Sequence, residues 1–293
     1  MVMKRGCVIG YDINEKGCQI SYYDDSMEEP DTMMASSNNY LIPLVLGYFK
    51  DRWVFGKEAK RLAVVGEDCT ETDLYGKAKR REKVSLAGKT YDAVWLLAKY
   101  ISLTLQDFEN IQYLTFTTPE TDVDMAKMLK GIGQHIGVDK EIINVQDYKE
   151  SFCQYMIFQP KELWQYESAL FYCDEDRIKA YMLRRLRVDA SHGMNSFVTV
   201  DEVANAQRKE LEALYPIMNK EKSPDESFKS MIENVFEKKV ISSVYLTGEG
   251  FEKNWYPNSL RVLCNGRRAF MGNNLYSKGA CYKSIRKCEP NDD

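Results

Sequence analysis

Histidine is scarce in this 293-residue sequence: only His135 and His192 occur, and they lie far apart along the chain. Nothing therefore points to a Cys–His or Ser–His–Asp site, which uses a histidine as its base. The eight cysteines include no pair with the Cys-x-x-Cys spacing of zinc or redox sites. In a chain of this size we expect buried, reduced thiols rather than a framework of disulfides.

Long apolar runs and an excess of one charge are also absent. No stretch approaches the ~20 apolar residues that span a bilayer, and the basic start at residues 1–5 is not followed by the apolar segment of a signal peptide. The net charge of −4 gives no overall attraction to nucleic acid. We therefore expect a cytoplasmic protein whose partners are neither a membrane nor a nucleic acid.

What the sequence does contain is an alternation of strand and helix patterns. Short apolar runs bounded by Asn, Gly and Pro predict strands, and apolar residues three or four positions apart predict helices. Strands are expected at 6–13, 17–24, 41–49, 52–56, 111–119, 142–145, 168–174, 177–188, from 240 onward and at 261–265. Helices are expected at 57–65, 90–108, 121–136, from 148 onward, over most of 199–237 and at 274–285, and the basic run 75–84 is expected to be a loop or hairpin.

Two of the predicted strand–turn–strand segments lie about 160 residues apart, one at the start of the chain and one beginning at residue 168. Each is followed by alternating helices and strands. This repetition predicts a duplicated α/β architecture, with a cleft between two closely joined halves.

Five motifs follow one another along nearly the whole chain. They are CVIGYDINEKGCQISYYD (7–24), IPLVLGYFKDRWVFGKEAKRLA (42–63), INVQDYKESFCQYM (143–156), SALFYCDEDRIKAYML (168–183), and VYLTGEGF (244–251) with NNLYSKGACYKSI (273–285). In this order they resemble the phosphate, connecting and adenosine motifs of the actin, sugar-kinase and heat-shock-chaperone ATPase superfamily. The nearest resemblance is to a diverged bacterial branch of actin-like proteins.

The resemblance implies an α/β class of fold with a defined arrangement. This is the two-lobed actin-like ATPase fold, in which duplicated ribonuclease-H-like subdomains surround a central cleft. Lobe I would comprise residues 1–148 plus 277–293, with the first phosphate motif and the closing helix. Lobe II would comprise residues 149–276, with the second phosphate hairpin and the adenosine-type turn.

Three acidic residues match functional positions of that superfamily. Asp12 ends the first strand, where the resemblance implies a magnesium ligand acting through waters; an Asp that caps an ordinary turn is the alternative. Asp174 matches a second metal ligand, and the tip of a solvated acidic hairpin is its alternative. Asp147 matches the catalytic acid that orients the attacking water.

The resemblance also implies contacts with a nucleotide. The implied cofactor-binding residues are Asn14, Gly248, Glu249, Gly250, Lys278 and Gly279. Asn14 belongs to the phosphate turn, and Gly248 to Gly250 form the turn under the nucleoside. The alternatives are a tight turn whose glycine has a positive φ, and a closing helix that packs closely against that turn through Gly279.

Both phosphate turns lack the glycines that let backbone N–H groups converge on an anion: Ile13 and Asn14 follow Asp12, and 173–177 contains no glycine. We therefore expect a regulatory or scaffolding module with weak or no ATP turnover. The alternative is a diverged Mg-dependent ATPase that acts as a nucleotide switch or forms filaments. ATP or ADP with Mg²⁺ is the implied cofactor, and its complete loss is the alternative. The expected partners are proteins, and self-association is left open.

Overall fold

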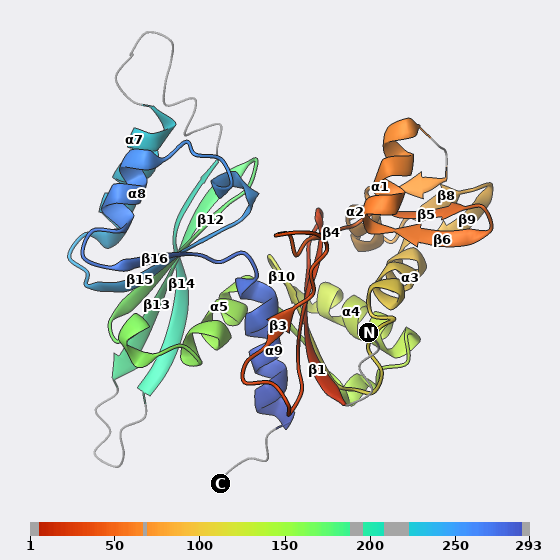
Figure 1. Cartoon of the computed structure of the whole chain (residues 1–293), viewed down its shortest axis with the longest axis horizontal. Helices are drawn as coiled ribbons and strands as arrows, with labels where there is room; N and C mark the ends of the chain where they lie inside the picture. Colours follow the sequence, from red (N-terminus) through yellow and green to blue (C-terminus); the bar gives the residue numbers. More distant parts are fainter. Residues whose placement is uncertain (1–5, 67–68, 188–195, 208–222, 289–293) are drawn as a thin grey trace. The chain divides into compact units, whose positions relative to one another are not determined.

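The computed structural model describes residues 6–66, 69–187, 196–207 and 223–288 (Figure 1). Strands and helices alternate along the chain, so the mixed α/β class predicted from the sequence is confirmed. The chain divides into two compact units: unit 1 is Met1–Ser151 with Tyr276–Asp293, and unit 2 is Phe152–Leu275.

The main sheet of unit 1 has the first strand of the chain at its centre. In spatial order the strands are β11 (Ile143–Asp147), β10 (Ile111–Thr118), β1 (Cys7–Ile13), β2 (Gly17–Tyr23) and β3 (Asp31–Thr32), and β4 (Ile42–Pro43) also pairs with β2. β1, β10 and β11 run parallel, whereas β1–β2 and β2–β3 are antiparallel. All seven residues of β1 are buried, as expected for a strand that is covered on both faces.

The two faces of this sheet are covered by different helices (Figure 1). Successive side chains of β1 point to opposite faces. Ile9 and Tyr11 join the apolar core shared with α3 (Ala93–Thr104) and α4 (Val123–His135). On the other face lie α5 (Tyr148–Ile157) and α9 (Leu275–Cys288). There a Cβ on Gly10 would lie 2.1 Å from the carbonyl oxygen of Ser277, so α9 touches the backbone of β1 and only glycine leaves it room.

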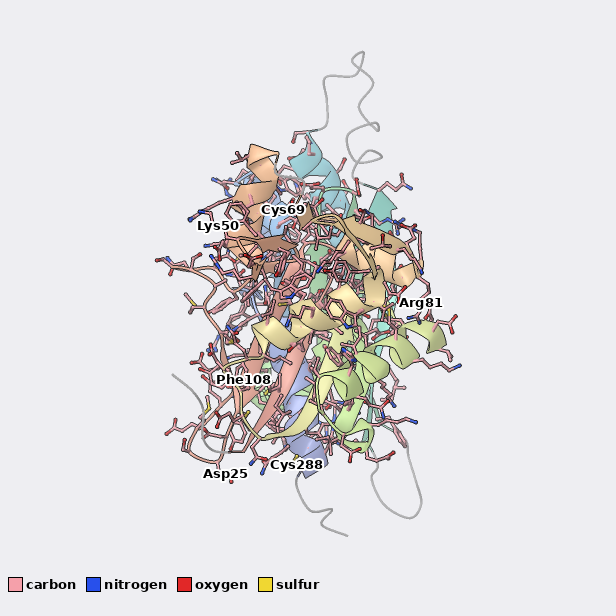
Figure 2. The ribbon with its side chains drawn as sticks, turned by 90° about the vertical axis from the view of Figure 1, so that its right-hand side faces the viewer. Asp25, Lys50, Cys69, Arg81, Phe108 and Cys288 are labelled. Carbon is pink, nitrogen blue, oxygen red and sulfur yellow. The ribbon has the colours of Figure 1, made fainter. Side chains whose placement is uncertain are left out.

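Short elements fill the segment between β4 and α3, and Figure 2 looks onto this side of unit 1. They are β5 (Leu46–Phe49), α1 (Gly56–Val65), α2 (Leu74–Lys79), β6 (Arg52–Phe55), β7 (Thr70–Glu71), β8 (Lys83–Leu86) and β9 (Lys89–Asp92). The single strand predicted at 41–49 is wrong, because 44–45 separates β4 from β5. The loop or hairpin predicted at 75–84 is wrong in its first half, where α2 buries Tyr75 and Ala78 at helical spacing.

The sheet of unit 2 has the same topology as that of unit 1. In spatial order its strands are β14 (Ser196–Gln207), β13 (Arg177–Arg187), β12 (Glu167–Cys173), β15 (Ile241–Thr247) and β16 (Arg268–Met271). β12 is antiparallel to β13 and parallel to β15, as β1 is to β2 and β10. In both units the first strand therefore lies at the centre, with an antiparallel hairpin on one side and parallel strands on the other.

Two predictions in unit 2 are wrong. The helix predicted over most of 199–237 is a strand as far as Gln207, because β14 pairs along its length with β13; residues 208–222 lie outside those that the structure describes. Of the part of this stretch that the structure describes, Pro224–Phe236 is helical and forms α7. The strand predicted at 261–265 lies largely within α8 (Pro257–Leu263). Single 3-10 turns complete the described elements: η1 (Lys140–Ile142), η2 (Lys161–Leu163) and η3 (Glu249–Phe251).

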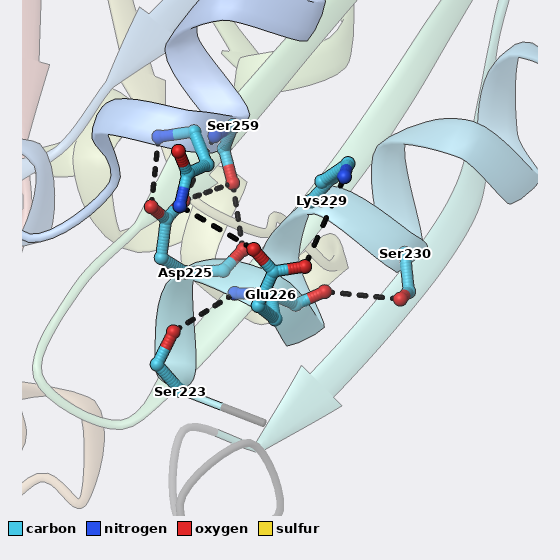
Figure 3. A network of polar contacts seen from close by, with 7 residues as sticks. Ser223, Asp225, Glu226, Lys229, Ser230 and Ser259 are labelled. Atoms are coloured by element: carbon cyan, nitrogen blue, oxygen red, sulfur yellow. Dashed lines mark hydrogen bonds and ion pairs between the residues drawn. The ribbon is translucent and has the colours of Figure 1, made fainter. Parts of the chain in front are cut away.

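The start of α8 is held by a carboxylate from α7 (Figure 3). The side chain of Asp225 accepts hydrogen bonds from the backbone N–H groups of Asn258 and Ser259, both at 2.8 Å, and from the Ser259 hydroxyl at 2.7 Å. Burial disfavours the charged form, but these donors outweigh it and hold the pKa of Asp225 below its usual range. Asp225 thus satisfies N–H groups at the first turn of α8, and this explains a helix where the sequence pattern indicated a strand.

All eight cysteines are free, as the sequence predicts. Cys264, after α8, and Cys288, at the end of α9, are exposed rather than buried. Among the described residues no helix is both long enough and apolar enough to cross a membrane.

Candidate functional site

The turn between β1 and β2 is closed by the side chain of Asn14. The backbone N–H of Asn14 donates to the carbonyl oxygen of Gly17 at 3.0 Å. Its side-chain Oδ1 accepts from the backbone N–H groups of Lys16 at 2.8 Å and Gly17 at 3.2 Å. The backbone donors at this turn, which a phosphate-binding turn directs at an anion, are therefore bonded to an oxygen of the protein itself.

The turn between β12 and β13 has the same construction, with an aspartate in place of the asparagine. The Asp174 N–H donates to the carbonyl oxygen of Arg177 at 3.0 Å. Its Oδ1 accepts from the backbone N–H groups of Asp176 and Arg177, both at 2.7 Å. Here the acceptor is charged, so the bonds are stronger than neutral ones. Asp174 is thus a turn cap that carries its own negative charge to the place where a phosphate would approach.

The matching turns show which residues of the two hairpins correspond. Asn14 corresponds to Asp174, and Asp12, two residues before its turn, corresponds to Tyr172. The strand register agrees, because Asp12 and Tyr172 each pair with the residue seven positions further on. The superfamily resemblance implies similar metal-binding roles for Asp12 and Asp174. The structure places them at different positions of their hairpins.

Asp12 is 4% exposed and lies at the carboxyl end of β1. Its Oδ1 accepts a hydrogen bond of 2.7 Å from the hydroxyl of Tyr148, the first residue of α5. Asn14 donates from Nδ2 to the same hydroxyl at 3.1 Å. The Tyr148 ring stacks on Tyr276 of α9, with centroids 3.7 Å apart and planes 5° from parallel. Tyr148 therefore joins Asp12, Asn14 and α9 in one network.

Burial raises the pKa of Asp12 to about 7, and the hydrogen bond from Tyr148 offsets part of this rise. A buried carboxylate is stabilised by a cation or by several N–H donors. Asp12 has instead one neutral hydroxyl donor, which favours the carboxylate but does not outweigh the effect of burial. The site therefore holds a carboxyl group that gains or loses its proton near neutral pH.

Asp147 ends β11, two strands away from β1 on the same sheet, and its side chain caps α5. Its Oδ1 accepts from the backbone N–H of Glu150 at 2.9 Å, and Lys149 Nζ lies 3.9 Å from Oδ2. Because β1, β10 and β11 are parallel, their carboxyl ends share one edge of the sheet, so Asp12 and Asp147 lie along the same edge. The cap gives Asp147 a structural role at the position that the resemblance assigns to catalysis.

A chain of buried hydroxyl and amide groups, which is not predicted from the sequence, crosses the same edge. Gln146 Nε2 donates to the Ser151 hydroxyl at 2.8 Å, which in turn donates to the Thr117 hydroxyl at 2.7 Å. Thr115 and Ser284 are joined in the same way at 2.8 Å. The available signal was the alternation of Thr with larger residues in IQYLTFTT, which places both threonines on the face that carries α5 and α9.

The glycine turn after β15 lies against the end of β12 within unit 2. Gly248 has a φ of +91°, and a Cβ there would lie 2.2 Å from the Cys173 carbonyl oxygen. A Cβ on Gly250 would lie 2.3 Å from the Cys173 sulfur, and the half-buried Glu249 begins η3 between them. Close packing onto the neighbouring strand therefore accounts for both glycines.

The two expected residues of the closing helix also have partners within unit 1. A Cβ on Gly279 would lie 2.0 Å from the carbonyl oxygen of Ser151, so α9 touches the backbone of α5 at this point. The sequence predicts that Gly279 serves packing against the 248–250 turn, and the packing that the structure shows is onto α5. Lys278 Nζ lies 3.9 Å from the Glu29 carboxylate.

No group of three or more His, Cys, Asp or Glu side chains able to hold a metal ion occurs within the described parts of the chain. Asp12 and Asp174 are also each engaged by donors of the protein. These residues do not fit the Mg²⁺–triphosphate arrangement that the superfamily resemblance implies, because both turns are closed by their own side chains.

The fold and site define a class of α/β protein: two units of one sheet topology, each opened by a hairpin whose turn is capped by its own Asx side chain. The chain belongs to a family of unknown function (DUF5716), whose C-terminal model matches residues 29–293. The matched stretch includes Asp174 and begins after β2, so Asp12 and Asn14 precede it. A search of curated proteins finds no match to the chain.

Proposed function

We propose that the chain has the two-lobed actin-like ATPase fold and serves as a cytoplasmic regulatory or scaffolding module that does not turn ATP over efficiently. The shared topology of the two sheets supports the fold, because a duplicated ribonuclease-H-like subdomain has one strand order in both copies. The order of the five sequence motifs supports it as well. In this proposal the fold is retained for its surfaces, and its partners are proteins.

The capped turns carry this proposal. A phosphate at either turn must take the N–H donors from Asn14 or Asp174, and the bonds to Asp174 are charge-assisted. At the second turn Glu175 and Asp176 add two further carboxylates beside Asp174. These neighbouring carboxylates repel an incoming polyphosphate, because both carry negative charge. Losing preorganised donors of this kind costs about 3 kcal/mol each in enzymes that depend on them.

One observation favours a second candidate, a diverged Mg-dependent ATPase that acts as a switch or forms filaments. Asp12 is a buried acid at the carboxyl end of a central parallel strand, which is where α/β proteins commonly bind ligands. For this candidate the Tyr148 hydroxyl has to leave Asp12, or a hydrated ion has to bind beside it. Neither turn then contributes the usual phosphate donors.

Calorimetric titration separates the two candidates. The purified chain is titrated with ATP and with ADP, each with and without Mg²⁺, and phosphate release is followed in parallel. We expect no saturable heat and no thermal stabilisation up to about 1 mM nucleotide, a limit that corresponds to ~4 kcal/mol of binding free energy. The turn variants Asn14→Gly and Asp174→Gly, which free the backbone donors, are the matched comparison.

Micromolar, Mg-dependent binding that is lost in Asp12→Ala contradicts the scaffold proposal and supports the ATPase. Weak binding that appears only in the Asn14→Gly and Asp174→Gly double variant supports the scaffold proposal. In that case the side-chain caps are what excludes phosphate from the native turns.

A further inference from the structure

An open groove of about 410 Å³ runs between α3 and α4 in unit 1. Its floor consists of Ala98, Met128 and Ile132, all of them buried. Trp95 forms one wall and is 37% exposed. The groove is thus lined by the indole of Trp95 and by apolar side chains, a composition typical of the centre of protein interfaces.

Positively charged side chains surround this apolar floor. Arg81, Lys127 and His135 line the groove, and Asp92 is the one acidic side chain among its lining residues. No side-chain hydrogen bond or ion pair joins any of the three basic residues to another residue within the described ranges. Arginine and lysine keep their charge at neutral pH. The rim therefore attracts an anion.

The backbone around the groove is arranged to leave it open. A Cβ built on Gly131, midway along the α4 side, meets nothing within 4 Å. Arg81, labelled in Figure 2, follows α2 and has a φ of +56°, in the left-handed region. The groove adjoins both the first turn of α3 and the last turn of α4, whose end potentials have opposite signs.

An aromatic cluster extends the surface beyond Trp95. Tyr91 stacks on Trp95 with centroids 5.4 Å apart, and Trp53 lies 5.8 Å from both rings. Lys99 Nζ lies 5.9 Å above the Trp53 ring. The surface next to the groove therefore repeats its combination of aromatic rings and positive charge.

We propose that this groove docks an acidic segment of a protein partner. An apolar side chain of the segment lies over Ala98 and Gly131 against Trp95, and flanking carboxylates pair with Arg81 and Lys127. Charge complementarity selects this occupant, because basic groups outnumber acidic ones on the rim and the floor is apolar. The proposal goes beyond the scaffold function and stands whether or not a nucleotide binds elsewhere.

The test uses the full chain and a fluorescein-labelled peptide in which Asp-Glu pairs alternate with Leu. Fluorescence anisotropy should show saturable binding with a dissociation constant below about 1 mM, weakening as salt is added. Two control peptides, one with Ser in place of Leu and one with Asn and Gln in place of the acids, should bind at least about tenfold more weakly.

Variants locate the site. Lys127→Glu should weaken peptide binding at least about tenfold, whereas the matched Lys130→Glu on the same helix, outside the groove lining, should change it less than about twofold. Gly131→Leu adds a side chain at a position where a Cβ meets nothing within 4 Å and should abolish binding, and Gln134→Leu is its matched control. Arg81→Gly should weaken binding while the melting temperature stays the same or rises, because glycine suits the positive φ.

Three results overturn the proposal. The first is an absence of saturable binding of the Asp-Glu-Leu peptide to the native chain. The second is an equal loss in Lys127→Glu and Lys130→Glu, which indicates non-specific attraction. The third is equal binding of the Leu-containing and Ser-containing peptides, which means that the apolar floor is not used. Melting curves of every variant exclude unfolding as the cause of a loss.

Discussion

At the scale of single residues, one oxygen atom of a side chain determines what each hairpin turn can bind. Asn14 Oδ1 and Asp174 Oδ1 each accept two backbone N–H groups of their own turn. In both turns these bonds satisfy backbone donors with an oxygen of the protein itself. The nearby Asp12 is engaged by the hydroxyl of Tyr148 instead of an N–H group or a cation.

Asp12 makes stability depend on pH in a specified direction. Its pKa of about 7 in the folded chain exceeds the ordinary value of 3.8, so the folded state retains this proton where the unfolded state has lost it. Stability contributed by protonated Asp12 is complete below about pH 4, falls as pH rises toward 7, and is lost above that. The free energy of unfolding of Asp12→Asn, measured relative to that of the native chain, should therefore rise by up to about 2–4 kcal/mol between pH 4 and pH 8.

Thermal unfolding of the native chain and of Asp12→Asn across that pH range measures the difference. A constant difference in melting temperature contradicts the assignment. Tyr148→Phe is the control. It removes a donor that lowers the Asp12 pKa, so the decline of stability with rising pH should continue to a higher pH than in the native chain.

At the scale of elements, unit 1 is held together by backbone contacts that leave no room for a side chain. α9 touches β1 at Gly10 and α5 at Gly279, with hypothetical Cβ contacts of 2.1 and 2.0 Å to carbonyl oxygens. Further along α9 the Ser284 hydroxyl donates to the Ile9 carbonyl at 2.9 Å. Polar groups and glycine thus replace the apolar packing used on the other face of the sheet.

Two glycines inside helices should therefore respond oppositely to alanine. Gly279→Ala should destabilise the chain by about 1–3 kcal/mol, since the new methyl group meets the backbone of α5 rather than a flexible side chain. Gly131→Ala on α4 meets nothing and should stabilise it by about 0.5–1 kcal/mol through helix propensity alone. Denaturant unfolding of both variants tests this. A change in the free energy of unfolding that has the same sign in both variants contradicts the close contact between α9 and α5.

Local patterns explain which of these elements the sequence predicts. The β1–β2 hairpin follows from a continuous apolar run, a turn at Asn14 and Gly17, and a second alternating run. β14 is missed because it is an edge strand with polar residues interspersed, and its pairing with β13 is what makes it extended. α8 is missed because its cap, Asp225, comes from a different helix.

The candidate site is less predictable than the fold because its contacts join distant residues. Tyr148 bonds to Asp12 across 136 positions, and no spacing rule within a motif indicates such a pair. Asp174 shows a second limit: an aspartate just after a strand suits both a metal ligand and a turn cap. Only the bonds to Asp176 and Arg177 decide between them.

At the scale of the whole molecule, the two units differ in how the chain builds them. Unit 2 is one continuous segment, Phe152–Leu275, whereas unit 1 combines Met1–Ser151 with the segment that carries α9. α9 covers one face of β1, and its Lys283 pairs with Glu150 of α5 at 2.9 Å. Unit 1 without α9 therefore exposes the face that carries Gly10.

The units should accordingly behave differently when expressed apart. A chain of residues 152–275 should unfold cooperatively, because its core is contained within it. Residues 1–151 alone should not, and joining them through a flexible linker to 273–293 should restore a cooperative transition. Circular dichroism with thermal melting distinguishes these outcomes, and a cooperative transition for 1–151 alone contradicts the role given to α9.

The position of α9 in the sequence also sets an order in time. β1 is made before unit 2, yet the helix that covers its Gly10 face is made after all of unit 2. At synthesis rates of about 5–20 residues per second, β1 waits on the order of ten seconds or more for that helix. During this interval one face of β1 lacks its helix while unit 2 is free to fold, so unit 1 begins before unit 2 and is completed after it.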